Sequence, residues 1–283
     1  MNSAAESRDY VLPADEYYGD QFVTDQVRKY KERGQNHWNE RMGKVLGMVH
    51  ESTKGPSDVL DLACGIGAFT IAAAKKGHRV IGLDYSETAL KAAEKLAREE
   101  GADCKFIHGD ATKLPFDDGS FDVVIASDII EHLFDPPLLR MFQECFRVLR
   151  KGGAFVFHTT PTRYLYLMSP LRALPLVPFA WLSQPKLDRI VELYERYPFT
   201  AIYKAVYGDT WVNITAKRGH CNCPEADHLH DMLESAGFTV DRYEPADAPA
   251  DLAGSRSYKI LAKIFKNSQH LRGHIWGLAR KPA

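Results

Sequence analysis

The sequence has almost no net charge. Its 36 Lys and Arg residues are balanced by 37 Asp and Glu residues, which leaves a formal charge of −1. A protein that binds nucleic acid through the phosphate backbone needs a positive field, and the chain as a whole supplies none. We therefore expect no nucleic-acid partner, and a small molecule is the favoured substrate.

Cysteines and long apolar runs are also scarce. The five cysteines are an odd number scattered over 283 residues, which argues against a disulfide framework. The first twenty residues contain no apolar run of the kind found in secretion signals. The most apolar stretch, 163–186, is interrupted by Arg172 and four prolines, whereas a spanning helix needs about 20 apolar residues. We expect a cytoplasmic protein, with this stretch as a candidate for peripheral membrane contact.

Short apolar runs alternate with amphipathic stretches along most of the chain. Such alternation predicts an α/β fold, in which right-handed crossovers join the strands of a doubly wound parallel sheet. A turn at Lys151-Gly152-Gly153 is expected to end the predicted helix 136–149. The predicted strands are 57–63, 79–84, 103–110, 120–128, 154–160, 238–245 and 274–282, the last at or inside the sheet edge; the predicted helices are 38–49, 68–77, 86–101, 136–149 and 224–238.

The alternation is interrupted once, which suggests three parts. Residues 1–55 form a helical N-terminal segment, and residues 56–160 together with 222–283 form the core. Residues 161–221, rich in Pro, Tyr and Leu, are interpreted as an insertion that follows the fifth strand. Its apolar side chains fit a lid over an acceptor pocket, a membrane contact or a homodimer interface, and these alternatives remain open.

A glycine loop follows the first predicted strand. In the stretch 59–68, Gly65 and Gly67 lie between a strand and a helix. Glycines allow a tight turn and a close approach of the backbone to a ligand, and the helix N-terminus presents unpaired N–H groups. A glycine pair alone is weak evidence, because it also serves simply to turn a strand into a helix.

Three carboxylates strengthen the prediction of a ligand site. Asp61, Asp84 and Asp110 come at the ends of the first three predicted strands. In a doubly wound sheet these strand ends meet at one crevice, where a carboxylate can accept hydrogen bonds from ribose hydroxyls. Together the three acids predict a pocket for a nucleoside.

The predicted pocket suits a nucleoside cofactor that carries a positive charge better than one that carries phosphates. A dinucleotide fingerprint needs Gly or Ala where Thr70 stands, and the ATP-binding loop motif is absent here. Asp61 beside the loop would repel a pyrophosphate, whereas it suits the ammonium and sulfonium groups of S-adenosylmethionine. This charge pattern favours S-adenosyl-L-methionine over NAD.

The chain resembles the class I S-adenosylmethionine-dependent methyltransferases over residues 57–160. Within that family it is most similar to the small-molecule branch that includes methyltransferases of ubiquinone and menaquinone biosynthesis. The segments that carry the resemblance are VLDLACGIGAFTIAAA, VIGLDYS, FIHGDATKLPFDDGSFDVVIASDIIEHL and FRVLRKGGAFVF.

The resemblance implies a seven-stranded Rossmann-like sheet whose last strand is antiparallel. It also implies roles for residues at matching positions. The methionine part would be surrounded by Asp61, Ala63, Gly65 and Gly67; Asp84 would hold the ribose; Tyr85, Asp110 and Ala111 would contact the adenine; Ser127 and Asp128 would line the methyl-transfer site.

A hydroxyl acceptor additionally needs a general base, and histidine suits neutral pH. The candidates are His132, His158 and His220, with His132 and His158 as the predicted catalytic residues. Asp128, Glu131 and His132 also permit a metal interpretation, but no fourth ligand is evident, so we expect no metal. Cys221 and Cys223 lack zinc-site spacing and are interpreted as structural.

The sequence therefore predicts methyl transfer from S-adenosylmethionine to the oxygen or carbon of a small aromatic or lipid-like acceptor. Two alternatives stay open: an NAD(P)-dependent oxidoreductase on a related fold, and a non-catalytic subunit that binds S-adenosylmethionine and supports a partner.

Overall fold

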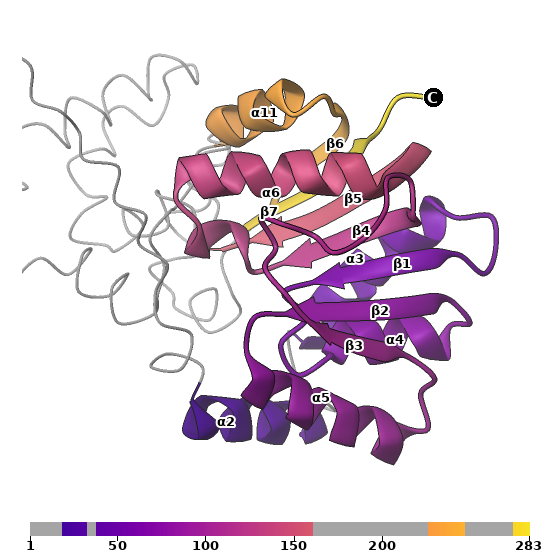
Figure 1. Ribbon diagram of the computed structural model, residues 1–283, viewed down its shortest axis with the longest axis vertical. Coiled ribbons are helices and arrows are strands. Elements are labelled where there is room, and N and C mark those ends of the chain that lie inside the picture. Colours follow the sequence, from indigo (N-terminus) through magenta and orange to yellow (C-terminus); the bar gives the residue numbers. More distant parts are fainter. Residues whose placement is uncertain (1–18, 33–37, 161–225, 247–273) are drawn as a thin grey trace, which may run out of the picture.

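The structure, a computed structural model, describes residues 19–32, 38–160, 226–246 and 274–283. The insertion predicted at 161–221, with its apolar stretch and His220, lies outside these residues, as do Cys221 and Cys223. Within the described part, seven strands form one sheet in the order β3-β2-β1-β4-β5-β7-β6 (Figure 1). The strands are β1 (Asp58–Leu62), β2 (Arg79–Asp84), β3 (Lys105–His108), β4 (Phe121–Ser127), β5 (Leu149–Thr159), β6 (Thr239–Ala246) and β7 (His274–Arg280).

The first five strands are parallel, and β7 runs antiparallel to both of its neighbours, β5 and β6. This arrangement confirms the predicted fold class, including the antiparallel last strand. Strand order reverses between β1 and β4, which lie side by side in the sheet. Open α/β sheets bind their ligands at such a switch point, outside the carboxyl ends of the strands.

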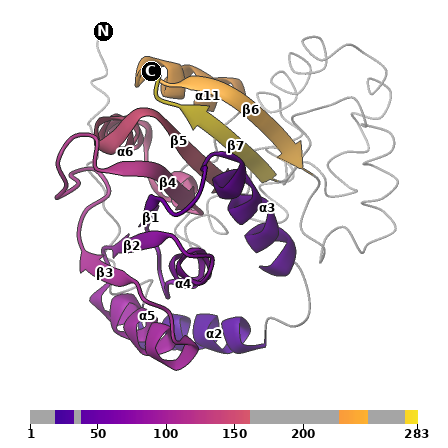
Figure 2. The same ribbon diagram turned by 90° about the vertical axis from the view of Figure 1, so that its right-hand side faces the viewer.

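Helices cover both faces of the sheet (Figure 2). Helices α3, α4 and α5 lie on one face, with α2 packed on α5, and α6 and α11 lie on the other. None of the helices in the described ranges is long and apolar enough to span a membrane. The helices are α2 (Asp20–Lys31), α3 (Trp38–Glu51), α4 (Ala68–Lys75), α5 (Glu87–Glu100), the short 3-10 helix η1 (Ile130–His132), α6 (Asp135–Val148) and α11 (Ala226–Ser235).

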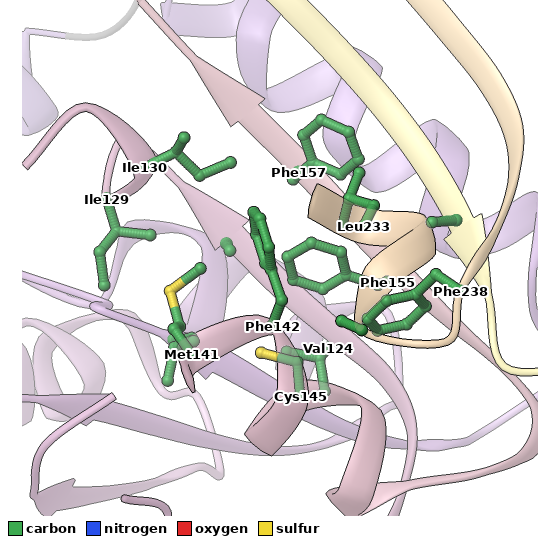
Figure 3. Close-up of a cluster of buried hydrophobic side chains, with 14 of the residues drawn as sticks. Val124, Ile129, Ile130, Met141, Phe142, Cys145, Phe155, Phe157, Leu233 and Phe238 are labelled. Carbon is green, nitrogen blue, oxygen red and sulfur yellow. The ribbon is translucent and has the colours of Figure 1, made fainter. Parts of the chain in front are cut away.

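Strand β5 separates two cores because its side chains alternate between the faces of the sheet. Phe155 and Phe157 face α6 and α11, where the ring of Phe155 lies 5.8 Å from Phe142 and 5.4 Å from Phe238 (Figure 3). Val156 lies on the opposite face and packs with residues of α3 and α4. His158, two residues after Val156, lies on the same face of the sheet and nearer the carboxyl end of β5.

The turn predicted at Lys151-Gly152-Gly153 does not separate α6 from the following strand. Helix α6 ends at Val148 and β5 begins at Leu149, so the glycines form an irregularity inside a longer strand. A side chain at Gly153 would meet the carbonyl oxygen of Arg150 at 2.8 Å. The glycines are therefore needed for a kink in β5, and apolar periodicity alone did not reveal that the strand continues through it.

A substitution at Gly277 on β7 tests how tightly β7 packs against the Phe157 side chain of β5. Gly277 pairs with Phe157 across the antiparallel ladder, and a Cβ there would overlap the buried Phe157 ring. We expect Gly277→Ala to lower the free energy of unfolding by about 1–3 kcal/mol, as overpacked cores do. Chemical denaturation measures the change.

The matched control is Gly47→Ala in α3, where an added Cβ meets nothing within 4 Å. Because alanine restricts the unfolded chain and favours helix, this variant should gain about 0.5–1 kcal/mol. Equal stability of the two variants would contradict the packing described for β7.

Candidate functional site

Backbone strain is concentrated at the switch point of the sheet. Among the described residues, Ala63 and Asp128 are the only non-glycine residues with positive φ, at +55° and +62°. Each immediately follows one of the two neighbouring strands, β1 and β4. Left-handed conformations cost most residues about 1–2 kcal/mol, and such strain clusters at functional sites. The two strand ends are therefore the place to look for chemistry.

The two glycines of the loop after β1 have different roles. Both have positive φ, +54° at Gly65 and +77° at Gly67. A Cβ at Gly67 would lie 2.7 Å from the Phe106 ring, so that glycine is required by the packing of α4 on the sheet. A Cβ at Gly65 would meet nothing within 4 Å. Gly65 therefore presents an open side that a ligand can approach.

Asp61 is buried, with 1% of its surface exposed, and anchors helix α4. The backbone N and the Oγ1 of Thr70 both donate to its Oδ2, at 2.9 and 2.5 Å. Burial raises its pKa to about 7, against the lowering effect of the Thr70 hydrogen bonds, and the Asp84 charge adds to the rise. Thr70, which in the sequence served only to disfavour a dinucleotide, thus holds this carboxylate in place.

Asp84 connects the end of β2 to the glycine loop. Its Oδ2 accepts from the N–H of Gly65 at 2.7 Å, and its Oδ1 accepts from the N–H of Ser86 at 2.8 Å. Burial raises its pKa, although these backbone donors act in the opposite direction. Each carboxylate oxygen has a second lone pair, so both can accept from a diol while keeping these contacts.

The predicted adenine-contacting residues lie at the ends of β2 and β3. The Tyr85 side chain is 54% exposed, and its ring lies 5.8 Å from the His108 ring. Asp110 Oδ1 accepts from the N and Oγ1 of Thr112, at 2.7 and 2.9 Å, and Ala111 follows, half-buried. An exposed aromatic face beside a polar turn suits a flat heteroaromatic base.

Ser127 closes the same edge from β4. Its Oγ is buried and has no hydrogen-bond partner, an arrangement that is costly unless a ligand supplies the partner. With the open side of Gly65 and the exposed ring of Tyr85, this unpartnered hydroxyl is compatible with the predicted nucleoside that carries a polar tail.

A second polar group lies beside the first, at the ends of β4 and β5. His158 is fully buried, and its Nδ1 lies 2.6 Å from Asp128 Oδ1. Because a carboxylate only accepts, Nδ1 is the protonated nitrogen. The Arg41 guanidinium donates to Asp128 Oδ2, and the ring of Trp276 lies 4.0 Å from the His158 ring. Sequence reasoning missed Arg41, which is 87 residues away from Asp128 along the chain.

The ionisation of Asp128 follows from these neighbours. Burial acts to raise its pKa, but the charge of Arg41 and the interaction with His158, including its hydrogen bond, outweigh burial and hold the pKa well below its ordinary value. Asp128 is therefore an anion at every physiological pH. Its negative charge lies at the centre of the polar group at the ends of β4 and β5.

Glu131 and His132 follow on the short helix η1. Glu131 is buried on η1, where Thr159 Oγ1 donates to its Oε2 at 2.8 Å, and burial together with the Asp128 charge raises its pKa well above the ordinary value. His132 is half-buried at the end of η1. Within the described ranges, no three His, Cys, Asp or Glu side chains are grouped to hold a metal ion.

Comparison with known proteins assigns this arrangement to a family. Residues 59–153 match the family described as methyltransferase domain. A demethylmenaquinone methyltransferase of Lactococcus lactis is 31% identical over 215 residues, which cover 72% of this chain and 71% of that protein. The corresponding enzyme of Staphylococcus aureus is 37% identical over 210 residues, covering 71% and 73%. A probable S-adenosylmethionine-dependent methyltransferase of Mycolicibacterium smegmatis is 40% identical over 145 residues, 51% of this chain and only 52% of that relative's length.

Solved structures agree on the fold. An S-adenosylmethionine-dependent methyltransferase of Clostridium acetobutylicum superposes with a TM-score of 0.57 at 13% identity, covering 93% of this chain and 99% of that one. The cyclase SpnF superposes with a TM-score of 0.55 at 20% identity, covering 88% and 84%. At such identities the likeness concerns the fold alone.

The switch-point site and the doubly wound sheet define an α/β enzyme that binds a nucleoside cofactor. With the relatives above, the chain belongs to the class I S-adenosylmethionine-dependent methyltransferases. S-adenosyl-L-methionine is accordingly its cofactor, as the charge pattern predicted, and the oxidoreductase alternative loses its support.

The Asp84 carboxylate gives a direct test of the predicted ribose contact. Asp84→Asn keeps one oxygen for the backbone donors but removes the charge, so S-adenosylmethionine should bind about 2–3 kcal/mol more weakly, as charge-assisted hydrogen bonds to hydroxyls are lost. Isothermal titration calorimetry measures this. Asp103→Asn, an exposed acid just before β3, is the control and should bind normally. Unchanged affinity in Asp84→Asn would disprove the ribose assignment.

Proposed function

We propose that the enzyme methylates an oxygen or carbon of a small aromatic acceptor of the reduced-quinone type. The two demethylmenaquinone methyltransferases compared above are each matched over more than two thirds of their own length, which supports an acceptor of the reduced-quinone type. The observation that carries the proposal is the 2.6 Å contact between Asp128 and His158 at the carboxyl ends of adjacent strands. A phenolic acceptor needs such a base, whereas a neutral amine does not.

Binding and orientation come from the loop residues. S-adenosylmethionine supplies a methyl group on a sulfonium, which leaves as a neutral thioether. In this proposal Asp84 holds the ribose, Tyr85 lies against the adenine, and the peptide around Gly65 approaches the methionine part, so that the methyl group faces the ends of β4 and β5. Holding two reactants in line can contribute about 7–11 kcal/mol.

Proton removal is the task of His158 in this proposal. Asp128 accepts the hydrogen bond from Nδ1–H and fixes the tautomer, so a proton from the acceptor can only be received at Nε2. The ring is held by Trp276 on β7, which restricts its rotation. An aromatic hydroxyl that loses its proton here becomes a stronger nucleophile at its oxygen and at the ring carbons next to it. His132, half-buried on η1, is the second candidate for the base.

The acceptor class is tested by following labelled methyl groups. The enzyme, with S-adenosylmethionine labelled in its methyl group, is offered a reduced naphthoquinol, a catechol and, as a matched control, an aromatic amine of similar size. We expect labelled product from the naphthoquinol, a lower rate with catechol, and none from the amine. Transfer to the amine alone would contradict the proposal, and cofactor binding without transfer to any acceptor would favour the non-catalytic alternative.

The base is tested by replacing each histidine with glutamine. His158→Gln should lower kcat about 10²–10⁴-fold, the usual contribution of general base catalysis, while S-adenosylmethionine affinity stays within twofold. The control is His230→Gln on α11, an exposed histidine that pairs with Glu234. If His132→Gln abolishes transfer and His158→Gln does not, the assignment of the base is wrong.

A further inference from the structure

We propose that Arg41 of α3 is a positioning residue that, through Asp128, keeps His158 unprotonated and ready to act as a base at neutral pH. The inference rests on the role proposed above for His158. It adds Arg41, a residue of the N-terminal helical segment, to a site otherwise built from the glycine loop and from residues at the strand ends.

The first step is the way in which Asp128 shares its two oxygens. Oδ1 is bound by His158 Nδ1, and Oδ2 is bound by the Arg41 guanidinium. The Arg41 side chain is only 13% exposed, so water screens this ion pair poorly and its effect on neighbouring charges is correspondingly large. Asp128 also holds a left-handed backbone conformation, φ +62°, and the Arg41 guanidinium and the His158 Nδ1–H together hold the carboxylate in one orientation.

The second step is the way in which α3 brings Arg41 to this position. Val45 and Val49 are buried on the sheet, where they pack with Val156 and Leu278. Residues four apart lie on the same side of a helix, so Arg41 extends the stripe of Val45 and Val49 by one turn. The apolar part of the stripe fixes the helix on the sheet, and its polar end reaches the carboxyl edge of β4 and β5.

The third step is the charge balance around His158. A histidine beside an isolated carboxylate holds its proton more tightly, whereas a second cation on that carboxylate opposes this effect. The described charged and titratable groups near His158 are Arg41 and Lys44 from α3, with Lys44 Nζ 5.2 Å from the Trp276 ring, and Asp128, Glu131 and His132 from the end of β4 and η1.

Their balance favours a neutral imidazole. Burial and the Asp128 charge raise the pKa of Glu131 well above its ordinary value, which weakens its anionic character relative to Asp128. Among the described residues, the Asp128 anion therefore faces two cations, Arg41 and Lys44. Without Arg41, the uncompensated Asp128 would stabilise the imidazolium, and a protonated His158 cannot accept a proton from the acceptor.

The test is a histidine NMR titration of the whole protein labelled with ¹⁵N-histidine, with the His158 signals assigned by their loss in His158→Gln. In Arg41→Met, the His158 pKa should rise by about one unit or more, the usual effect of removing a close charge. Arg41→Lys keeps the charge and should restore most of the wild-type value. The control is Arg28→Met on α2, an exposed arginine that pairs with Glu32, and it should leave His158 unchanged.

A second pair of variants keeps the test decisive if Arg41→Met does not fold. Asp128→Asn removes the anion and should lower the His158 pKa, because the imidazolium loses its carboxylate partner. In the double variant Asp128→Asn/Arg41→Met, the His158 pKa should stay close to that of Asp128→Asn, because Arg41 acts through Asp128. A rise of about one unit or more in the double variant, or an equal pKa in wild type and a folded Arg41→Met, would overturn this role of Arg41.

The titration needs no acceptor, so its result is separable from the proposed function. If the His158 pKa shifts as expected but His158→Gln transfers methyl groups at the wild-type rate, the proposed base is wrong while the electrostatic link stands. If methyl transfer depends on His158 but Arg41→Met changes neither the His158 pKa nor the acidic limb of the pH–rate profile, the role of Arg41 is wrong. When both hold, that limb should move to higher pH by the same amount as the His158 pKa.

Discussion

The site depends on one constraint: carboxylates that are buried or half-buried at the ends of strands must find donors within the protein. Asp61 finds them at the N-terminus of α4, through Thr70, and Asp128 finds them in Arg41 and His158. A buried acid without such partners would be too costly to keep. The donors in turn fix the neighbouring elements, so the same bonds that make burial tolerable also hold the glycine loop, α3 and β5 in register.

The different partners give these acids different chemistry. Asp61 has only neutral donors, and its pKa is raised to about 7, so an incoming positive charge would favour its ionised form. Asp128 is paired with the Arg41 cation and accepts a hydrogen bond from His158, and it remains ionised. The end of β1, with Asp61, is thereby suited to a cationic cofactor, and the end of β4, with Asp128, is suited to hold a base. The left-handed residues Ala63 and Asp128 follow these two neighbouring strands.

The fold was largely predictable because each of its signals is local. Ser86 and Gly101 were expected to bound the helix after β2, and the structure confirms both: Ser86 Oγ accepts from the N–H of Ala89 at 3.2 Å, and Gly101 is left-handed. The kink at Gly152 and Gly153 was misread, because a pair of glycines after a helix has the same local pattern whether it ends the helix or bends a strand.

Residue types and their order were thus enough to predict the parallel sheet, the loop at Gly65 and Gly67, the acids at the strand ends and a sulfonium cofactor, since strand ends follow from periodicity and chain order. The pairing of Arg41 with Asp128 was not available in that way. A contact across 87 residues depends on how α3 lies on the sheet, which is set by packing among many side chains. Burial, too, arises only after the chain has folded, and burial is what raises the pKa of Asp61 and strengthens the charges around His158.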